Sequence, residues 1–179
     1  MLEGLVTEEA PLIGVEPSAI LTFRDEYPDL VDDELLEASK RLSANCLLID
    51  EFIAREIGKG NIRSELFTKE ARSVKLHGHC QQKSMSSLVA AKKALSLPAN
   101  FEVQLIPSGC CGMAGSFGYE KEHYDLSMQI GELVLFPTVR AQPAEVEIVA
   151  SGTSCRHQIH DGTQRHAKHT AEVLFEALA

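Results

Sequence analysis

Short apolar runs alternate with longer amphipathic stretches along this chain. Runs at residues 11–15, 73–77, 101–106 and 145–150 predict β-strands. Apolar residues at steps of three and four predict one or two helices over 32–57, ending at Gly58 or Gly60. The same spacing predicts helices over 81–95, over 121–135 with a stop near Pro137, from about 156, and from 167 to the end. Strands that alternate with helices predict an α/β fold, with a mostly parallel sheet of about four strands and helices on both faces.

Length and charge narrow the class of protein. The 179 residues, 44% of them hydrophobic, predict a single domain over 1–179 with a sizeable core. A formal charge of -9 argues against binding to nucleic acid or to an anionic membrane surface. No run approaches the roughly 18 apolar residues that span a bilayer, and the N-terminus lacks the regions of a signal peptide. We therefore expect no membrane span and a cytoplasmic location, with any contact to the inner membrane made through a complex.

A glycine-rich loop with two adjacent cysteines follows the predicted strand at 101–106. Adjacent side chains on extended backbone point to opposite faces, so Cys110 and Cys111 reach one object only if the chain turns sharply. Gly109 and Gly112 permit that turn and a close approach of backbone to a ligand. The alternative is a flexible connection that carries two buried, inert thiols.

The cysteines follow a pattern that favours a metal site. An odd count of five, without a secretory signal, favours metal or redox use over disulfides. Those that lie just past the carboxyl ends of predicted strands are Cys80, Cys110, Cys111 and Cys155. Parallel strands bring such positions to one edge of a sheet, where helix N-termini favour thiolates. Converging thiolates suit an iron–sulfur cluster or zinc, and they do not suit magnesium or calcium. Cys46 lies on a predicted apolar helix face and is expected to be a core residue.

Histidines near these cysteines offer further candidates. His79 is a candidate hydrogen-bond donor to a cluster sulfur, with backbone pairing as the alternative, and for His77 backbone pairing is the expectation. The pairs His157 and His160, and His166 and His169, have a spacing that would suit zinc, but a solvated polar face is the expectation for both.

The arrangement resembles a known family, the cysteine-rich CCG domain. The resemblance rests on Cys80, the Cys110-Cys111-Gly112 run and a distal Cys155, and on the segments 77–81, 111–119 and 152–158. These segments are similar to the second CCG repeat of FAD-linked 2-hydroxyacid oxidases. The family also occurs in heterodisulfide reductase and in the iron–sulfur subunits of glycolate oxidase, lactate utilisation and anaerobic glycerol-3-phosphate dehydrogenase complexes. The match runs from about Pro11 to the C-terminus.

The resemblance implies an iron–sulfur electron-transfer domain of an FAD-dependent 2-hydroxyacid dehydrogenase, of the glycolate or lactate type. It would relay electrons from flavin to a quinone or another carrier, while the substrate chemistry takes place on another domain or subunit. A 4Fe-4S cluster would be bound by the four cysteines that follow the strands, with Gly109, Gly112 and His79 around it. The chain would be the C-terminal fragment of a larger oxidoreductase, with flavin and ferredoxin-like domains as partners and FAD bound only there. We expect the isolated chain to lose its cluster in air.

Departures from the family pattern leave alternatives open. The fullest form ends in Cys-x-x-Cys and binds a noncubane cluster with five cysteines, but Gly152 stands where the first of that pair would be. An ordinary four-cysteine cluster or a ligand supplied by a partner would fit the remaining residues, and a zinc-binding structural or regulatory module is the alternative function.

The N-terminal segment resembles part of a second, truncated unit. Segment 13–19 matches 148–155 in a few positions, with Ala19 in the place of Cys155. An incomplete unit of this kind predicts either self-association or an exposed apolar patch near residues 2–20.

Overall fold

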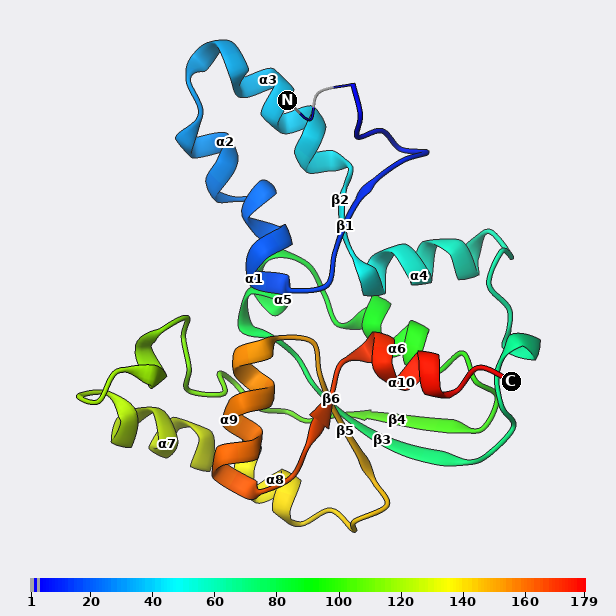
Figure 1. The fold of residues 1–179 in the computed structure, drawn as a ribbon, viewed down its shortest axis with the longest axis vertical. Coiled ribbons are helices and arrows are strands. Elements are labelled where there is room, and N and C mark those ends of the chain that lie inside the picture. The colour runs from blue at the N-terminus through cyan, green and yellow to red at the C-terminus, as the bar shows by residue number, and fades with distance from the viewer. Residues whose placement is uncertain (1, 3) are drawn as a thin grey trace.

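The computed structural model describes residues 2 and 4–179, and its strands form two parallel sheets. The strands are β1 (Leu12–Gly14), β2 (Cys46–Leu48), β3 (Arg72–His77), β4 (Phe101–Leu105), β5 (Glu147–Ala150) and β6 (Ala167–Lys168). β1 pairs with β2, while the larger sheet has the order β4-β3-β5-β6 and is parallel throughout (Figure 1). The predicted α/β fold with a parallel sheet of about four strands is confirmed.

Helices cover both faces of the larger sheet. The helices of the described chain are α1 (Pro17–Ile20), α2 (Glu26–Leu30), α3 (Asp33–Ala44), α4 (Ile49–Gly58), α5 (Cys80–Met85), α6 (Val89–Leu95), α7 (Tyr124–Glu132), α8 (Leu135–Arg140), α9 (Thr153–Thr163) and α10 (Thr170–Glu176). Short 3-10 turns lie at Leu21–Phe23, Ser64–Leu66 and Phe117–Tyr119. One core cluster packs α6 and α10 against the sheet through residues such as Leu76, Leu95 and Val173, and a second packs α8 and α9 through Phe136, Ile148 and Ile159. The cores form because the central strands bury apolar side chains on both faces.

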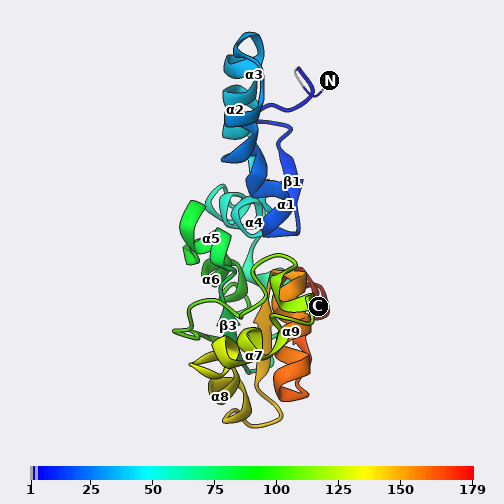
Figure 2. The ribbon, with the colours of Figure 1, turned by 90° about the vertical axis from the view of Figure 1, so that its left-hand side faces the viewer.

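Helices α2 and α3 project away from the larger sheet as a hairpin. In the side view they form one end of an elongated molecule, and α8 lies at the other end (Figure 2). Several of their apolar side chains remain exposed, among them Leu30 at 79% and Leu35 at 53%. The exposed apolar residues near the N-terminus include Leu5 at 69% and Val15 at 59%. Self-association of this end of the chain stays a prediction.

Several predicted helices are interrupted. The stretch 32–57 contains β2 between α3 and α4, because the apolar residues at 46–48 pair with β1. The helix expected over 81–95 breaks at 86–88 into α5 and α6. Pro137 lies inside the first turn of α8, where its missing N–H costs no helical hydrogen bond, so it does not end helical structure as expected. The C-terminal stretch from 167 begins with β6 before α10.

Helix length also bears on the membrane question. None of the helices in the described part of the chain is both long and apolar enough to cross a membrane.

Candidate metal centre

The four candidate cysteines line one cavity at the carboxyl ends of the central strands. Cys80 begins α5 after β3, Cys110 and Cys111 follow β4, and Cys155 lies in the first turn of α9 after β5. The cavity has a volume of about 260 Å³ and is lined by Ser18, His79, Cys80, Gln81, Cys110, Cys111, Ala114, Gly115, Ser154 and Cys155. The larger cavities of the described chain lie elsewhere, but none of them gathers thiols, so we place the chemistry here.

The site has a buried inner end and a more open outer end. Cys111 and Cys155 are 2% and 1% exposed, whereas Cys80 and Cys110 are partly exposed. All of the cysteines are free thiols, which leaves each sulfur available as a ligand. Cys46 is fully buried in β2 and packs in a separate cluster, so the expectation of a core residue is correct although the element is a strand.

Gly112 is the glycine that the cysteine loop requires. Its φ is +106°, and a Cβ built there would lie 2.2 Å from the carbonyl oxygen of Ser127. Its N–H donates to Cys110 Sγ over 3.3 Å, so the turn also orients that sulfur. Gly109 differs, because its φ is not positive and a Cβ would meet no heavy atom within 4 Å. Of the two predicted turn glycines, only Gly112 is sterically necessary.

Lys83 ties the cysteine loop to α5. Its ammonium donates to the carbonyl oxygens of Ser108 (2.9 Å) and Gly109 (2.7 Å), just before the cysteine pair. Hydrogen bonds from a charged group contribute more than neutral ones, so this contact holds Cys110 near Cys80.

We predict that Lys83→Met weakens metal binding by about tenfold, because two charge-assisted hydrogen bonds that order the loop are lost. Lys75→Met is the matched control, since Lys75 bonds only the side chain of Gln104 on the sheet. Competition with a metal chelator measures the affinity. Equal affinities of the two variants would show that Lys83 does not organise the loop.

The four thiols of the site differ in how readily they ionise. Cys80 and Cys111 act as the hydrogen-bond donors among them, and Cys110 and Cys155 act as the acceptors. Hydrogen bonds from its thiol neighbours lower the pKa of Cys110, and the bond from Cys111 lowers the pKa of Cys155 to about 5. Cys80 and Cys111 have raised pKa values, because each donates to a neighbouring sulfur and is desolvated. The lowered pKa values of Cys110 and Cys155 favour the thiolate form, which is the form that binds metal.

His77 lies at the buried end of the site, contrary to the expectation of backbone pairing. Its Nδ1 is 2.7 Å from Ser108 Oγ, and its buried Nε2 has no hydrogen-bond partner. One ring nitrogen of His77 and the sulfurs of Cys111 and Cys155 lie within 4.8 Å of one another. The sequence predicted that His77 lies at the end of a strand, but it did not predict the direction of the His77 ring.

His79 lines the more open part of the cavity. A Cβ at Gly152 would lie 2.3 Å from His79 Cδ2 and 3.3 Å from Cys155 Sγ, so the imidazole occupies the space that a side chain at 152 would take. His79 Nδ1 is buried without a hydrogen-bond partner, and the expected alternative of backbone pairing is not seen at that atom.

We predict that Gly152→Cys alone lowers the free energy of unfolding by about 2 kcal/mol, because the new side chain overlaps the His79 ring. The double change Gly152→Cys with His79→Ala should recover most of that loss. Urea unfolding of the reduced, metal-free protein measures both. A single variant as stable as the parent would mean that the ring moves aside at little cost.

Glu16 helps to position the helix that carries Cys155, a role that the sequence did not reveal. Its carboxylate accepts a 2.8 Å hydrogen bond from the backbone N–H of Thr153, the first residue of α9, and a 3.0 Å bond from Ser18. The segment before α1 thus contacts the first turn of the helix that carries Cys155, and Ser18 lines the cavity. The N-terminal unit therefore forms one wall of the site.

The histidines of the two spaced pairs are absent from the compact set of possible metal ligands in the described chain. The rings of His160 and His166 are tilted by 34° with centroids 4.8 Å apart, His157 Nδ1 is 2.8 Å from the Tyr119 hydroxyl, and buried His169 bonds the Val15 carbonyl oxygen. His157 and His160 lie three residues apart in α9 and line one cavity together with His166, whereas His166 and His169 are separated by β6 and do not share a helix.

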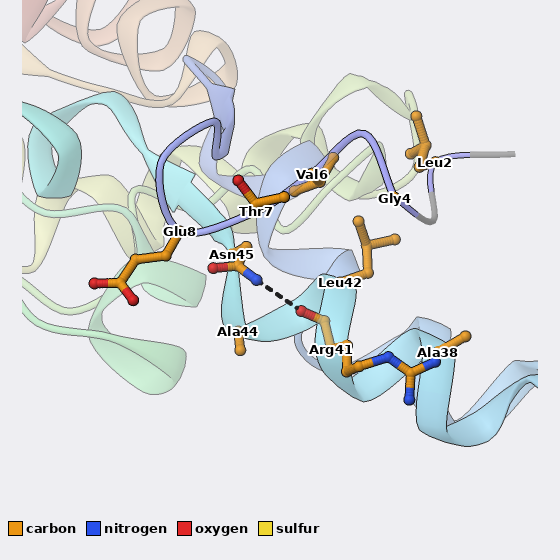
Figure 3. A pocket seen from close by; sticks show the side chains of 10 residues that line it. All are labelled: Leu2, Gly4, Val6, Thr7, Glu8, Ala38, Arg41, Leu42, Ala44 and Asn45. Carbon is orange, nitrogen blue, oxygen red and sulfur yellow. Dashed lines mark hydrogen bonds between the residues drawn. The ribbon is translucent and has the colours of Figure 1, made fainter.

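A cavity of about 370 Å³ lies between the N-terminal segment and α3 (Figure 3). Leu2 and Val6 line it opposite Leu42, and Asn45 donates to the carbonyl oxygen of Arg41 at its edge. Its lining contains no cysteine or histidine, which separates it from the metal chemistry.

Comparison with known proteins relates the chain to two kinds of dehydrogenase. It is 29% identical over 170 residues to D-2-hydroxyglutarate dehydrogenase of Escherichia coli K12, a match that covers 94% of this chain and 16% of the relative. It is 25% identical over 177 residues to a subunit of anaerobic glycerol-3-phosphate dehydrogenase from the same strain, covering 99% of this chain and 43% of the relative. D-2-hydroxyglutarate dehydrogenase of Pseudomonas putida is 26% identical over 177 residues, covering 98% of this chain and 16% of the relative.

This chain corresponds to only part of each relative. The chain spans less than half the length of each of these relatives. No family model and no solved structure matches it. The expected likeness to a 2-hydroxyacid dehydrogenase and to anaerobic glycerol-3-phosphate dehydrogenase is confirmed, while membership of the CCG domain family stays a prediction.

Proposed function

We propose that this chain is an iron–sulfur electron-transfer domain of a larger flavin-dependent dehydrogenase that acts on a 2-hydroxyacid. The observation that carries the proposal is the gathering of thiols from three strand ends around one cavity. The relatives support the proposal, because they are dehydrogenases and this chain matches only a part of each. Substrate oxidation, and the binding of FAD, would belong to other domains or subunits.

The sulfur atoms of the four cysteines suit an iron–sulfur cluster. Cys80, Cys110, Cys111 and Cys155 would hold the cluster, and soft thiolates are the ligands that iron–sulfur clusters take. A bound cluster would accept and release single electrons. Around it, Gly112 lets the loop turn closely against α7, Lys83 fixes the loop to α5, and His79 lines the partly open side. Ordered donors of this kind reduce the reorganisation that accompanies binding.

An electron-transfer role requires partners that donate electrons to the chain and accept electrons from it. Flavin and ferredoxin-like domains of the same protein or complex would deliver electrons, and a quinone or another carrier would receive them. The exposed outer end of the site, at Cys80 and Cys110, is where a partner would approach most closely. We place the complex in the cytoplasm and treat residues 1–179 as one domain of it.

An electron-transfer experiment tests this role. The chain, loaded anaerobically with iron and sulfide, is mixed with chemically reduced free flavin and then with a soluble quinone, and the visible absorbance is followed. We expect the flavin to bleach the cluster's absorbance bands and the quinone to restore them, whereas a zinc-loaded control should show only the bands of the flavin as the quinone oxidises it. If neither the flavin nor the quinone changed the absorbance of the iron-loaded chain, electron transfer would be contradicted, but metal binding would not.

A zinc-binding structural or regulatory module is the second candidate. One observation favours it: three donor atoms, from His77, Cys111 and Cys155, lie within 4.8 Å of one another, which is compact enough for a single ion. The two candidate functions are separated by measuring the iron and zinc content of the chain after it is purified without air from cells supplied with both iron and zinc. Stoichiometric zinc in a colourless protein would favour this module.

A further inference from the structure

His77 occupies the most enclosed position of the site. It is the last residue of β3, the strand flanked by β4 and β5, and its side chain is fully buried. Burial of a polar group without a partner costs free energy, so each ring nitrogen at this position needs a partner. Only one of the two has a hydrogen-bond partner in the structure.

The unpaired nitrogen belongs to a set of potential metal ligands. Nδ1 is held by Ser108 Oγ at 2.7 Å, which leaves Nε2 as the nitrogen available to the sulfurs of Cys111 and Cys155. All three side chains are buried, so water cannot readily supply the missing contact. A histidine that binds a metal usually has its other nitrogen held by a hydrogen bond, and Ser108 supplies that bond here.

We propose that His77 Nε2 is a direct metal ligand of this site, beside the thiolates of Cys111 and Cys155. The inference rests on the proposed metal binding and adds to it a nitrogen donor that the cysteine pattern does not contain. His77 donates Nδ1–H to Ser108 Oγ, and the lone pair of Nε2 then faces the metal. The inner end of the site has mixed nitrogen and sulfur ligation, while its outer end has Cys80 and Cys110.

His79 provides an internal comparison. Both histidines flank Cys80, but the His79 ring lies against Gly152 at the partly open side, and it is absent from the compact set of donor atoms. The proposal therefore assigns ligation to His77 and leaves His79 as a residue that fills space beside Cys155. Ligation by His77 also affects the reduction potential, because a neutral imidazole ligand gives an iron–sulfur centre a higher potential than a further thiolate would.

Isotope labelling tests the assignment without any substitution. The chain is produced with 15N-histidine or with natural histidine, loaded anaerobically with iron and sulfide, reduced, and measured by pulsed electron paramagnetic resonance. We expect a strong nitrogen coupling, of the size found for a coordinated imidazole, that changes with the isotope. A coupling only as weak as that of a hydrogen bond from Nε2–H to sulfur would overturn the proposal.

Matched variants identify the histidine. His77→Asn keeps a polar group near the Nδ1 position for Ser108 and removes Nε2, so the coupling should be lost, whereas His79→Asn should keep it. Loss in His79→Asn with retention in His77→Asn would overturn the assignment. A wild-type chain that binds no metal would contradict the proposed function as well, while a metal centre with sulfur ligands alone would overturn only this inference.

Discussion

Gly112→Ala is expected to destabilise the metal-free chain by about 3 kcal/mol, the larger of the two effects on folding that the site predicts. A non-glycine residue at φ +106° is strained, and the new Cβ would lie 2.2 Å from the Ser127 carbonyl oxygen and 2.9 Å from Gln158 Nε2. Those two groups hydrogen-bond each other across α7 and α9, so the loop cannot shift without disturbing that contact. Urea unfolding of the reduced protein gives the free energy.

Two glycines of the same loop serve as controls. Gly115→Ala has a positive φ but open space around it, so it should cost about 1 kcal/mol from backbone strain alone. Gly109→Ala has neither a positive φ nor a close neighbour and should leave stability nearly unchanged. If all three variants lost the same free energy, the close approach of Gly112 to α7 would not be what requires the glycine.

Cys155→Ala is expected to abolish the binding of iron and sulfide, because Cys155 is a buried donor in the first turn of α9 and has a pKa lowered to about 5 by its bond from Cys111. Cys46→Ala is the matched control. Cys46 is equally buried, but desolvation raises its pKa and it packs in a separate cluster, away from the cavity.

The two alanine variants separate ligation from packing. Each removes one buried sulfur, so each should lower stability by roughly 1–2 kcal/mol. Only Cys155→Ala should fail to take up iron and sulfide in anaerobic reconstitution, measured as bound iron after desalting. Equal iron contents in the two variants would remove Cys155 from the ligand set.

The sequence predicted the larger sheet well because its strands are separate apolar runs bounded by turn residues. β3, β4 and β5 each lie within or close to the predicted runs, and their parallel order brings the cysteines after them to one edge. β2 was missed since Cys46, Leu47 and Leu48 also fit the three- and four-residue spacing of the helices on either side. Only pairing with β1, which is distant in sequence, decides that they are extended.

The directions of the side chains at the site could not be predicted from the sequence, because they also depend on contacts with segments that are distant along the chain. His77 and His79 both precede Cys80, and the strand and loop that pack against each determine where each ring points. Ser108, on the loop after β4, orients His77, and Gly152, after β5, leaves room for His79. Glu16 reaches Thr153 across a separation of 137 residues, which no local pattern predicts.

The most direct test of the account is the iron and acid-labile sulfide content of the anaerobically reconstituted chain, measured with its visible spectrum and its paramagnetic resonance after reduction. The account predicts about four iron and about four sulfide per chain, broad visible absorbance, and a paramagnetic signal on reduction by one electron. Iron bound without sulfide, or a colourless chain that takes up only zinc, would contradict the claim that the thiols at the sheet edge hold an iron–sulfur cluster.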